Sequence, residues 1–491
     1  MILLIAPQLS KSQETRIVNY RADSIVRDER LFDGMKRLIG SVFMQHEELQ
    51  LTCDSAHLDE KTNRFIGFGR VHIIKADTIH IHARKIDYSG QNEKARLEEK
   101  IRMENGSVIL YTEMLDYDMK EDVAWYFGGG QIIDPTNTVE SYWGYYHVDR
   151  NEFIFRDQVV LSNDESTLLT DTLRYLSQTE EMWFSGFTEI YGDTNYISCQ
   201  KGYYDSKNSF SSFQNKVFMQ SAEQILRGDS LTYFRDSGDT EVFSAVEMQD
   251  TLEKITIRGE KLSYNDLSGW FRMSEEVYFI LADQTDSLFL FSDTLISTRD
   301  TLSKSRHIQA FPRVSFFRED IQGRCKRLDY LVNDSLIKMF EDPVIWQDST
   351  QLTADSIQVR LADKGIRFMK MEGNGFMIIQ EDSTLFNQIK GKLITGWFSE
   401  DQLEWVDVTG NGETLFFPPN EDEIIGMNRV TCSNIRIWFK EGKLHDLRFY
   451  TEIEPQLTPM KDVIETEKVL EGFRWQADSR PKDREDIRNW K

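Results

Sequence analysis

The chain has 491 residues and a formal net charge of −24, with 58 Lys and Arg residues against 82 Asp and Glu residues. Aromatic residues make up 12% of the sequence, which is too many for a disordered chain, and the length alone suggests about three domains of about 150 residues. The acidic balance argues against nucleic-acid binding, which needs a basic stripe, and against docking on an anionic membrane by charge alone.

The first 19 residues form an N-terminal segment that opens with the apolar run 1–6, MILLIA. A secretory signal needs a basic region and then an apolar core of about 7–15 residues, and neither is complete here. Two interpretations stay open: the remnant of a signal peptide whose start was assigned too late, or a short apolar terminus without a role.

Residues 20–300 carry an internal repeat of regular period. A tyrosine recurs every 29 residues without a gap at Tyr88, Tyr117, Tyr146, Tyr175, Tyr204 and Tyr233, and Tyr264 follows after 31. Self-similarity at a fixed period is the sequence signature of a repeat architecture. Residues 301–450 continue the repeat with irregular spacing, through Tyr330, Val359 and Ile437. Residues 451–491 form a charged tail, for which we expect a short helix or loop and then disorder.

Three apolar columns keep their phase with the tyrosines. They lie two residues before, nine residues after and fifteen residues after each tyrosine. Their members include Leu115, Leu173, Leu231 and Leu262 in the first column, Phe155, Phe184 and Phe213 in the second, and Met103, Ile132, Leu161, Ile190, Met219, Met248 and Phe279 in the third. We expect these side chains to line the interior.

A fourth column, five residues before each tyrosine, holds only small residues. Its members are Ala22, Cys53, Ala83, Thr112, Ser141, Thr170, Cys199, Gly228, Gly259, Ser292, Cys325, Ala354 and Cys432. All four cysteines fall in this column, with no CxxC spacing. Because a free cysteine behaves as a small hydrophobe, and stacked repeats hold the four too far apart for disulfides, we predict four free, buried thiols.

Within each repeat apolar and polar residues alternate, and clusters of Asp, Asn, Ser and Gly separate the alternating runs. This pattern predicts two half-buried strands and two turns in each unit. Such a unit cannot bury its apolar face alone, so the units stack into an elongated all-β repeat protein of about 13 two-strand units. The small column lies an odd number of residues from the next apolar column. A bend between them would give a V-shaped cross-section.

The columns resemble the OstA-like family, which includes LptA and the N-terminal domain of LptD. The resemblance covers roughly residues 20–450. Its motif is a small residue followed by Asp, Ser or Thr and an aliphatic residue. Three copies are Ala22-Asp23-Ser24-Ile25, Gly228-Asp229-Ser230-Leu231 and Ala354-Asp355-Ser356-Ile357; the stretches 389–392, 396–398 and 408–413 fit as well.

The resemblance implies a β-jellyroll, or "β-taco", folded around an apolar groove that shields lipopolysaccharide acyl chains in the periplasm. The interior columns above are then the lipid-groove candidates. It also implies partners among other Lpt-type transport components, or self-association by edge-strand pairing, and no enzymatic activity. The residues themselves predict no metal, no cofactor and no nucleic-acid partner. The chain is similar to the larger OstA-like proteins of Bacteroidota.

Alternatives remain at this stage. The apolar columns fit a closed core as well as a groove, and a repeat stack also suits an extracellular β-solenoid that binds or cleaves polysaccharide, or a structural envelope protein. His72, His80 and His82 include an H-x-H pair of the kind that binds zinc or copper, yet no other repeat supplies partners, so we expect solvated histidines. The run 128–130, Gly-Gly-Gly, lacks P-loop spacing and predicts a bend.

Overall fold

The structure, a computed structural model, describes residues 19–27, 34–46, 48–282, 287–300, 305–362, 365–399, 402–420, 423–440 and 443–490. The chain divides into two compact units, Met1–Asn215 and Lys216–Lys491, and each is described by itself. The described residues contain β-strands and short 3-10 turns but no α-helix, which confirms the all-β prediction.

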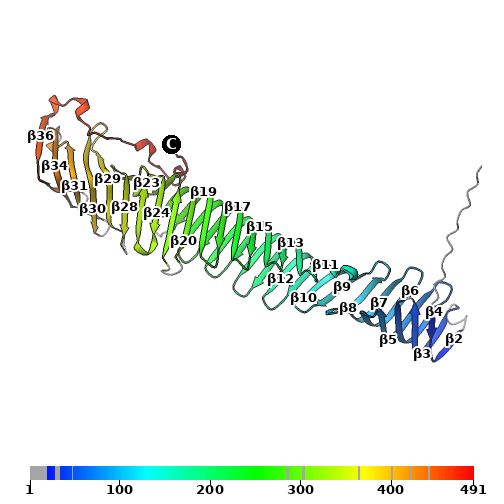
Figure 1. Cartoon of the computed structure of the whole chain (residues 1–491). Helices are drawn as coiled ribbons and strands as arrows, with labels where there is room; N and C mark the ends of the chain where they lie inside the picture. The colour runs from blue at the N-terminus through cyan, green and yellow to red at the C-terminus, as the bar shows by residue number, and fades with distance from the viewer. Residues whose placement is uncertain are drawn as a thin grey trace, which may run out of the picture. The chain divides into compact units, whose positions relative to one another are not determined.

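Unit 1 is a stack of antiparallel hairpins. From β3 to β14 every strand pairs with the next one along the chain, and β1 and β2 both pair with β3 (Figure 1). The strands are β1 (Asn19–Arg21), β2 (Ser24–Arg27), β3 (Lys36–His46), β4 (Leu49–Asp59), β5 (Arg64–Lys75), β6 (Ile79–Ser89), β7 (Lys94–Asn105), β8 (Val108–Asp118), β9 (Val123–Ile133), β10 (Thr138–His147), β11 (Glu152–Ser162), β12 (Ser166–Leu176), β13 (Glu181–Gly192) and β14 (Tyr196–Asp205). One repeat is thus one hairpin, as the alternating pattern predicts.

Unit 2 continues the hairpin pattern. Its strands are β16 (Gln224–Phe234), β17 (Asp239–Asp250), β18 (Ile255–Asn265), β19 (Trp270–Leu281), β20 (Leu288–Arg299), β21 (Arg306–Phe311), β22 (Val314–Arg318), β23 (Ile321–Cys325), β24 (Arg327–Leu331), β25 (Leu336–Phe340), β26 (Val344–Gln347), β27 (Thr350–Thr353), β28 (Ser356–Leu361), β29 (Ile366–Gln380), β30 (Phe386–Ser399), β31 (Gln402–Phe416), β34 (Gly426–Lys440), β35 (Lys443–Tyr450) and β36 (Glu454–Pro459); a small separate pair is β32 (Pro419–Asn420) with β33 (Glu423–Ile424), and β15 (Phe210–Gln220) contains the boundary between the units. Between β20 and β29 the strands are broken into halves, which form two ladders: β21–β24–β25–β28 and β22–β23–β26–β27. Both ladders rejoin at β29.

Each long strand bends once, at a corner where the pairing register shifts. In β9 the corner is Gly128 and Gly129, with φ of 86° and 108°, and in β11 it is Asp157 and Gln158, with φ of 65° and 55°. The corner gives every hairpin two arms: the tyrosine arm, which carries the repeated tyrosine, and the second arm. The predicted bend is confirmed, and Gly128 and Gly129 belong to it.

The small-residue column lies at the corners of the neighbouring strands. The hydroxyl of Ser141 donates to the carbonyl of Trp143 at 2.8 Å, that of Ser292 to the carbonyl of Thr294 at 3.0 Å, and the thiol of Cys53 to the carbonyl of Ser55 at 3.3 Å. Each side chain therefore fits the crowded corner and hydrogen-bonds a carbonyl two residues further on, beside the bulge. The sequence columns show the small size but not this hydrogen bond.

All four cysteines are buried with free thiols, as predicted. Burial raises the pKa of the Cys53 and Cys199 thiols from 9.0 to about 11.

We expect the native protein at about pH 8 to react slowly with Ellman's reagent, and all four thiols to react once it is denatured, because the thiolate is the reactive form. Because the pKa of these thiols is higher in the folded than in the unfolded chain, their contribution to the free energy of unfolding is fully present below pH 9. This contribution is lost as the pH rises toward 11. Rapid titration of several thiols in the native protein would contradict the buried assignment.

The expectation of a disordered tail is wrong. After β36 the chain forms 3-10 turns and, over residues 468–490 (the strap), runs back along the second arm of unit 2, past β30, β27 and β23 to β19 (Figure 1). Leu470 is 2% exposed in a cluster with Phe376 and Leu415, and Ile487 is 0% exposed beside Tyr278 and Phe291.

Buried glutamines hold the strap between these two apolar anchors. The Gln388 amide donates to the carbonyl of Lys468 at 2.8 Å and accepts from the amide N–H of Leu470 at 2.8 Å. Gln351 makes the same two-sided contact, donating to the carbonyl of Arg474 and accepting from the N–H of Gln476. Buried polar side chains need such partners, and the sequence alone does not show that these two glutamines are buried.

Candidate functional site

The interior between the two arms of unit 1 is a packed core. Of the groove candidates in this unit, eight are buried, with exposures of 6% or less: Met103, Leu115, Ile132, Phe155, Leu161, Leu173, Phe184 and Phe213. Stacked rings add to the packing, since Phe153 lies 4.2 Å from Tyr146 and 5.9 Å from Phe155 between ring centroids. Ile190 differs, because it is half-buried.

Polar bridges close the mouth of unit 1, where the free ends of the two arms meet. The phenol of Tyr88 lies 2.7 Å from Nδ1 of His46, and that of Tyr146 accepts from Asn105 Nδ2 at 2.7 Å. One residue of each pair comes from the end of the second arm, and the tyrosine comes from the other arm. The repeated tyrosine is therefore both an interior side chain and the bridge across the mouth.

The same bridge recurs in the neighbouring hairpins. Lys75 donates to the carbonyl of Met119 at 2.7 Å and reaches the Tyr117 ring, whose hydroxyl donates to Asp122 at 2.9 Å. Tyr175 donates to Asp134 Oδ2 at 2.6 Å. Burial, and then the neighbouring carboxylate, raise the pKa of Tyr117 and of Tyr175, so both phenols stay protonated donors. His46, Lys75, Asn105 and Asp134 recur every 29 or 30 residues but share no chemistry, so the sequence shows no column there.

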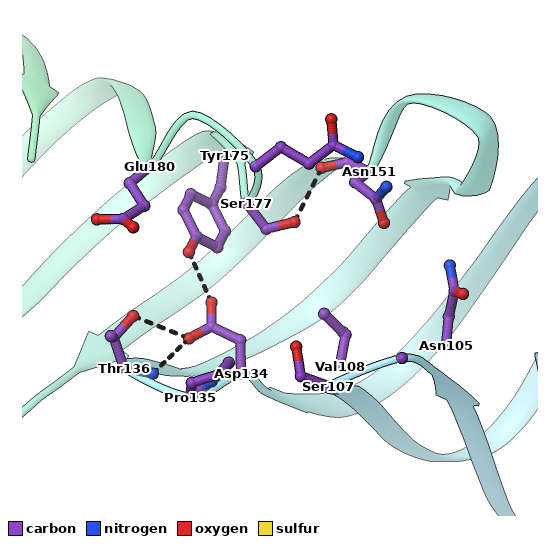
Figure 2. Close-up of a pocket in the computed structure, with 12 residues that line it drawn as sticks. Asn105, Ser107, Val108, Asp134, Pro135, Thr136, Asn151, Tyr175, Ser177 and Glu180 are labelled. Carbon is purple, nitrogen blue, oxygen red and sulfur yellow. Dashed lines mark hydrogen bonds between the residues drawn. The ribbon is translucent and has the colours of Figure 1, made fainter. Parts of the chain in front are cut away.

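A pocket of about 360 Å³ lies at this mouth, beside the Tyr175–Asp134 bridge (Figure 2). Figure 2 shows Asp134 also accepting from Thr136, and Ser177 donating to the carbonyl of Asn151. The described residues that line the pocket are mostly polar and include no Lys, Arg or His. The pocket therefore offers neither the apolar wall that an acyl chain needs nor a cation for a phosphate.

The interior of unit 2 is more open over its first hairpins. Leu231, Val242, Leu262 and Met273 form a buried floor, with exposures of 1% or less. Above it Met219, Met248 and Phe279 on the second arm, and Tyr233 and Tyr264 on the tyrosine arm, are half-buried. The Tyr233 hydroxyl donates to Asp266, which follows β18 on the same arm, at 3.2 Å and so does not bridge the mouth. These half-buried apolar side chains form a partly exposed strip above the apolar floor, interrupted by Ile257, which is 3% exposed and pairs with Met248 and Phe279.

Other candidate chemistry does not gather into a site. Nε2 of His72 lies 3.3 Å from Nδ1 of His80, and the rings of His72 and His82 stack at 4.2 Å. Burial lowers the pKa of His72 and of His82, which favours the neutral rings. Within the described part of the chain, no group of three or more His, Cys, Asp or Glu residues is arranged to hold a metal ion, and no helix is long and apolar enough to cross a membrane.

Fold and interior together define a stack of two-armed β-hairpins with an apolar interior. Residues 14–171 match the family model described as OstA-like protein, which confirms the resemblance to OstA-like proteins over this part of the chain. No curated protein matches the chain.

Among solved structures, the chain is similar to LptH of Pseudomonas aeruginosa, described as the LptA-homologous periplasmic component of the conserved lipopolysaccharide transport device. The two are 13% identical, and the match covers 28% of this chain and 95% of LptH, with a TM-score of 0.23. A likeness this weak carries no argument about function.

Proposed function

We propose that this chain is a lipopolysaccharide-binding component of a transport bridge in the periplasm, which shields acyl chains in the apolar strip of unit 2. The observation that carries the proposal is the half-buried row of Met219, Met248 and Phe279 above the buried floor. The OstA-like match over residues 14–171 supports the same role. Flexible methionine side chains suit acyl chains of variable length and branching. The role is one of binding and transfer, without catalysis.

Met219, Met248 and Phe279 are the groove candidates of unit 2 to which the half-buried exposure points, and Ile190 is the half-buried candidate of unit 1. Of the ten buried candidates, Leu231 and Leu262 belong to the floor of unit 2, and the other eight pack in the closed core of unit 1. At the end of the chain, β35 and β36 both pair with β34 and end the described sheet of unit 2. A terminal strand of this kind offers unpaired backbone groups to another strand, so we propose a second copy or another Lpt-type component as the partner there.

Photo-crosslinking tests the lipid site. A photoreactive amino acid placed at Met219 or Met248 is expected to capture lipopolysaccharide in Gram-negative cells that make the chain. Met103 is the matched control, since it occupies the same column but is 2% exposed in the closed part of unit 1. Phe187, 58% exposed, is the control for random surface capture.

The proposal fails if Met219 and Met248 give no lipid adduct in cells where the protein is folded, or if Phe187 gives as much adduct as they do. Depletion that leaves surface lipopolysaccharide unchanged would favour a structural envelope role instead.

A further inference from the structure

The outer face of the tyrosine arm changes character along unit 1. Over β5–β8 it carries ion pairs, with Arg64 on Asp87 at 2.6 Å, Arg96 on Asp116 at 2.7 Å and Lys85 on Glu98 at 2.8 Å. On β9, β10, β13 and β14 the same outward positions hold Trp125, Phe127, Trp143, Tyr145, Trp183 and Tyr203, together called the aromatic face, whereas on β11 and β12 they hold Ile154, Arg156, Thr172 and Arg174. Every described residue of this face belongs to unit 1.

The rings of the aromatic face lie side by side on neighbouring strands. Trp125 pairs with Tyr145 across β9 and β10, and Phe127 pairs with Trp143, with ring centroids 5.5 Å apart. Farther along, Trp183 pairs with Tyr203 at 5.1 Å. Alternation along each strand turns these rings outward, because the residues between them, such as Tyr126 and Phe184, are buried in the interior. Trp143 is 37% exposed, and the other five side chains of the face are half-buried.

Some charged groups on the face are paired, whereas Arg156, opposite Trp143 on the neighbouring strand, and Lys201 are exposed and form no ion pair among the described residues. Arg174 lies with its guanidinium 4.6 Å from the centroid of the Trp183 ring and donates to Glu152 at 2.6 Å. The Tyr203 hydroxyl donates to Glu181 at 2.8 Å. The carboxylate oxygens of Glu152 and Glu181 and the N–H groups of Arg174 can also form hydrogen bonds with hydroxyls of a ligand.

A ligand that matches this face has apolar C–H faces for the rings, many hydroxyls for the polar groups and an extended shape. Sugars present C–H bonds that are weakly positive, and the face of an aromatic ring is negative. The strands β9–β14 cover five strand spacings of about 4.8 Å, or roughly 24 Å. An exposed aromatic patch rimmed by polar groups marks an interaction site.

We propose that the aromatic face binds a glycan chain that lies across β9–β14. This inference does not depend on the lipid-binding role, because the face lies outside the interior and on a different unit from Met219 and Met248.

Affinity electrophoresis with the full chain tests the proposal. The probes are the acyl-free polysaccharide released from lipopolysaccharide by mild acid and glycan strands freed of peptide from peptidoglycan, with dextran for comparison; the two envelope probes distinguish the two sources of the same chemistry. We expect retardation by at least one probe, together with a change in tryptophan fluorescence. Trp143→Ala and Trp183→Ala should each weaken the binding about tenfold, equivalent to about 1.4 kcal/mol.

Tyr111→Ala is the matched control, since Tyr111 is a 38% exposed aromatic residue on the second arm of the same unit. Circular dichroism verifies the folding of each variant, and Trp143→Phe, which keeps a ring, should restore most of the binding. The proposal is wrong if no probe retards the protein, or if both tryptophan variants bind like the unmodified chain. It is also wrong if the two variants lose an envelope protein and no glycan, which would make the face a protein interface.

Discussion

Removal of residues 469–491 is expected to destabilise unit 2 strongly and leave unit 1 unchanged. The truncation exposes the apolar clusters that Leu470 and Ile487 cover, and burying one such side chain is worth about 1.5–3 kcal/mol. It also leaves Gln351 without both of its backbone partners and Gln388 without the N–H of Leu470, at about 1–3 kcal/mol for each unsatisfied group. The total loss is on the order of 5–10 kcal/mol.

Hydrogen–deuterium exchange locates this effect. Protection should fall in β22, β23, β26 and β27, which lie under the strap, and stay unchanged in β5–β12. Two single substitutions form a matched pair: Leu470→Ala should reproduce part of the loss, whereas Val469→Ala, at a neighbouring residue that is 39% exposed, should cost little. Equal stability of the truncated and full chains would mean that the strap does not support the sheet.

Gly144→Ala is expected to destabilise unit 1 by about 3 kcal/mol, at the upper end of ordinary overpacking. A Cβ at Gly144 would lie 2.2 Å from a ring carbon of Tyr126. The Tyr126 ring is 2% exposed, and its hydroxyl lies 2.7 Å from the hydroxyl of Ser141, so the ring has little freedom to move. Thermal or denaturant unfolding of the variant measures the cost.

A second substitution separates this steric explanation from a backbone effect. Tyr126→Leu removes the ring that the new Cβ meets, so adding Gly144→Ala to Tyr126→Leu should cost far less than adding it to the unmodified chain. Gly106→Ala is the comparison for backbone strain, because Gly106 has φ of 58° and no atom within 4 Å of an added Cβ. It should cost about 1 kcal/mol. Additive effects of Gly144→Ala and Tyr126→Leu would contradict the proposed contact.

Much of the fold could be predicted from the sequence because one hairpin is one repeat. The 29-residue tyrosine spacing marks the hairpins, and the odd offset of the small column predicts the corner that Gly128, Gly129 and Ser141 form. The strap could not be predicted, because it carries no repeat and its partners are remote: the Gln351 amide meets the carbonyl of Arg474, 123 residues away.

The candidate site could be predicted only in part. Apolar columns identify interior side chains such as Met103 and Met248, but the same residue type serves a closed core in unit 1 and a half-open strip in unit 2. The difference comes from the tyrosine partner: Tyr146 bridges to Asn105 across the mouth, whereas Tyr233 bonds to Asp266 on its own arm. Dissimilar residues make these bridges, so no sequence column shows where the interior closes.

The one-hairpin repeat also determines how such a chain can change in length. Each hairpin returns the backbone to the arm where it started, so insertion or loss of one whole repeat keeps every later strand in register with its neighbour and every corner in line. A change by a single strand would instead exchange the two arms for all that follows, placing tyrosines where the third column belongs. Duplication of complete hairpins therefore preserves the strand pairing, and the number of strands in the stack changes by two at a time.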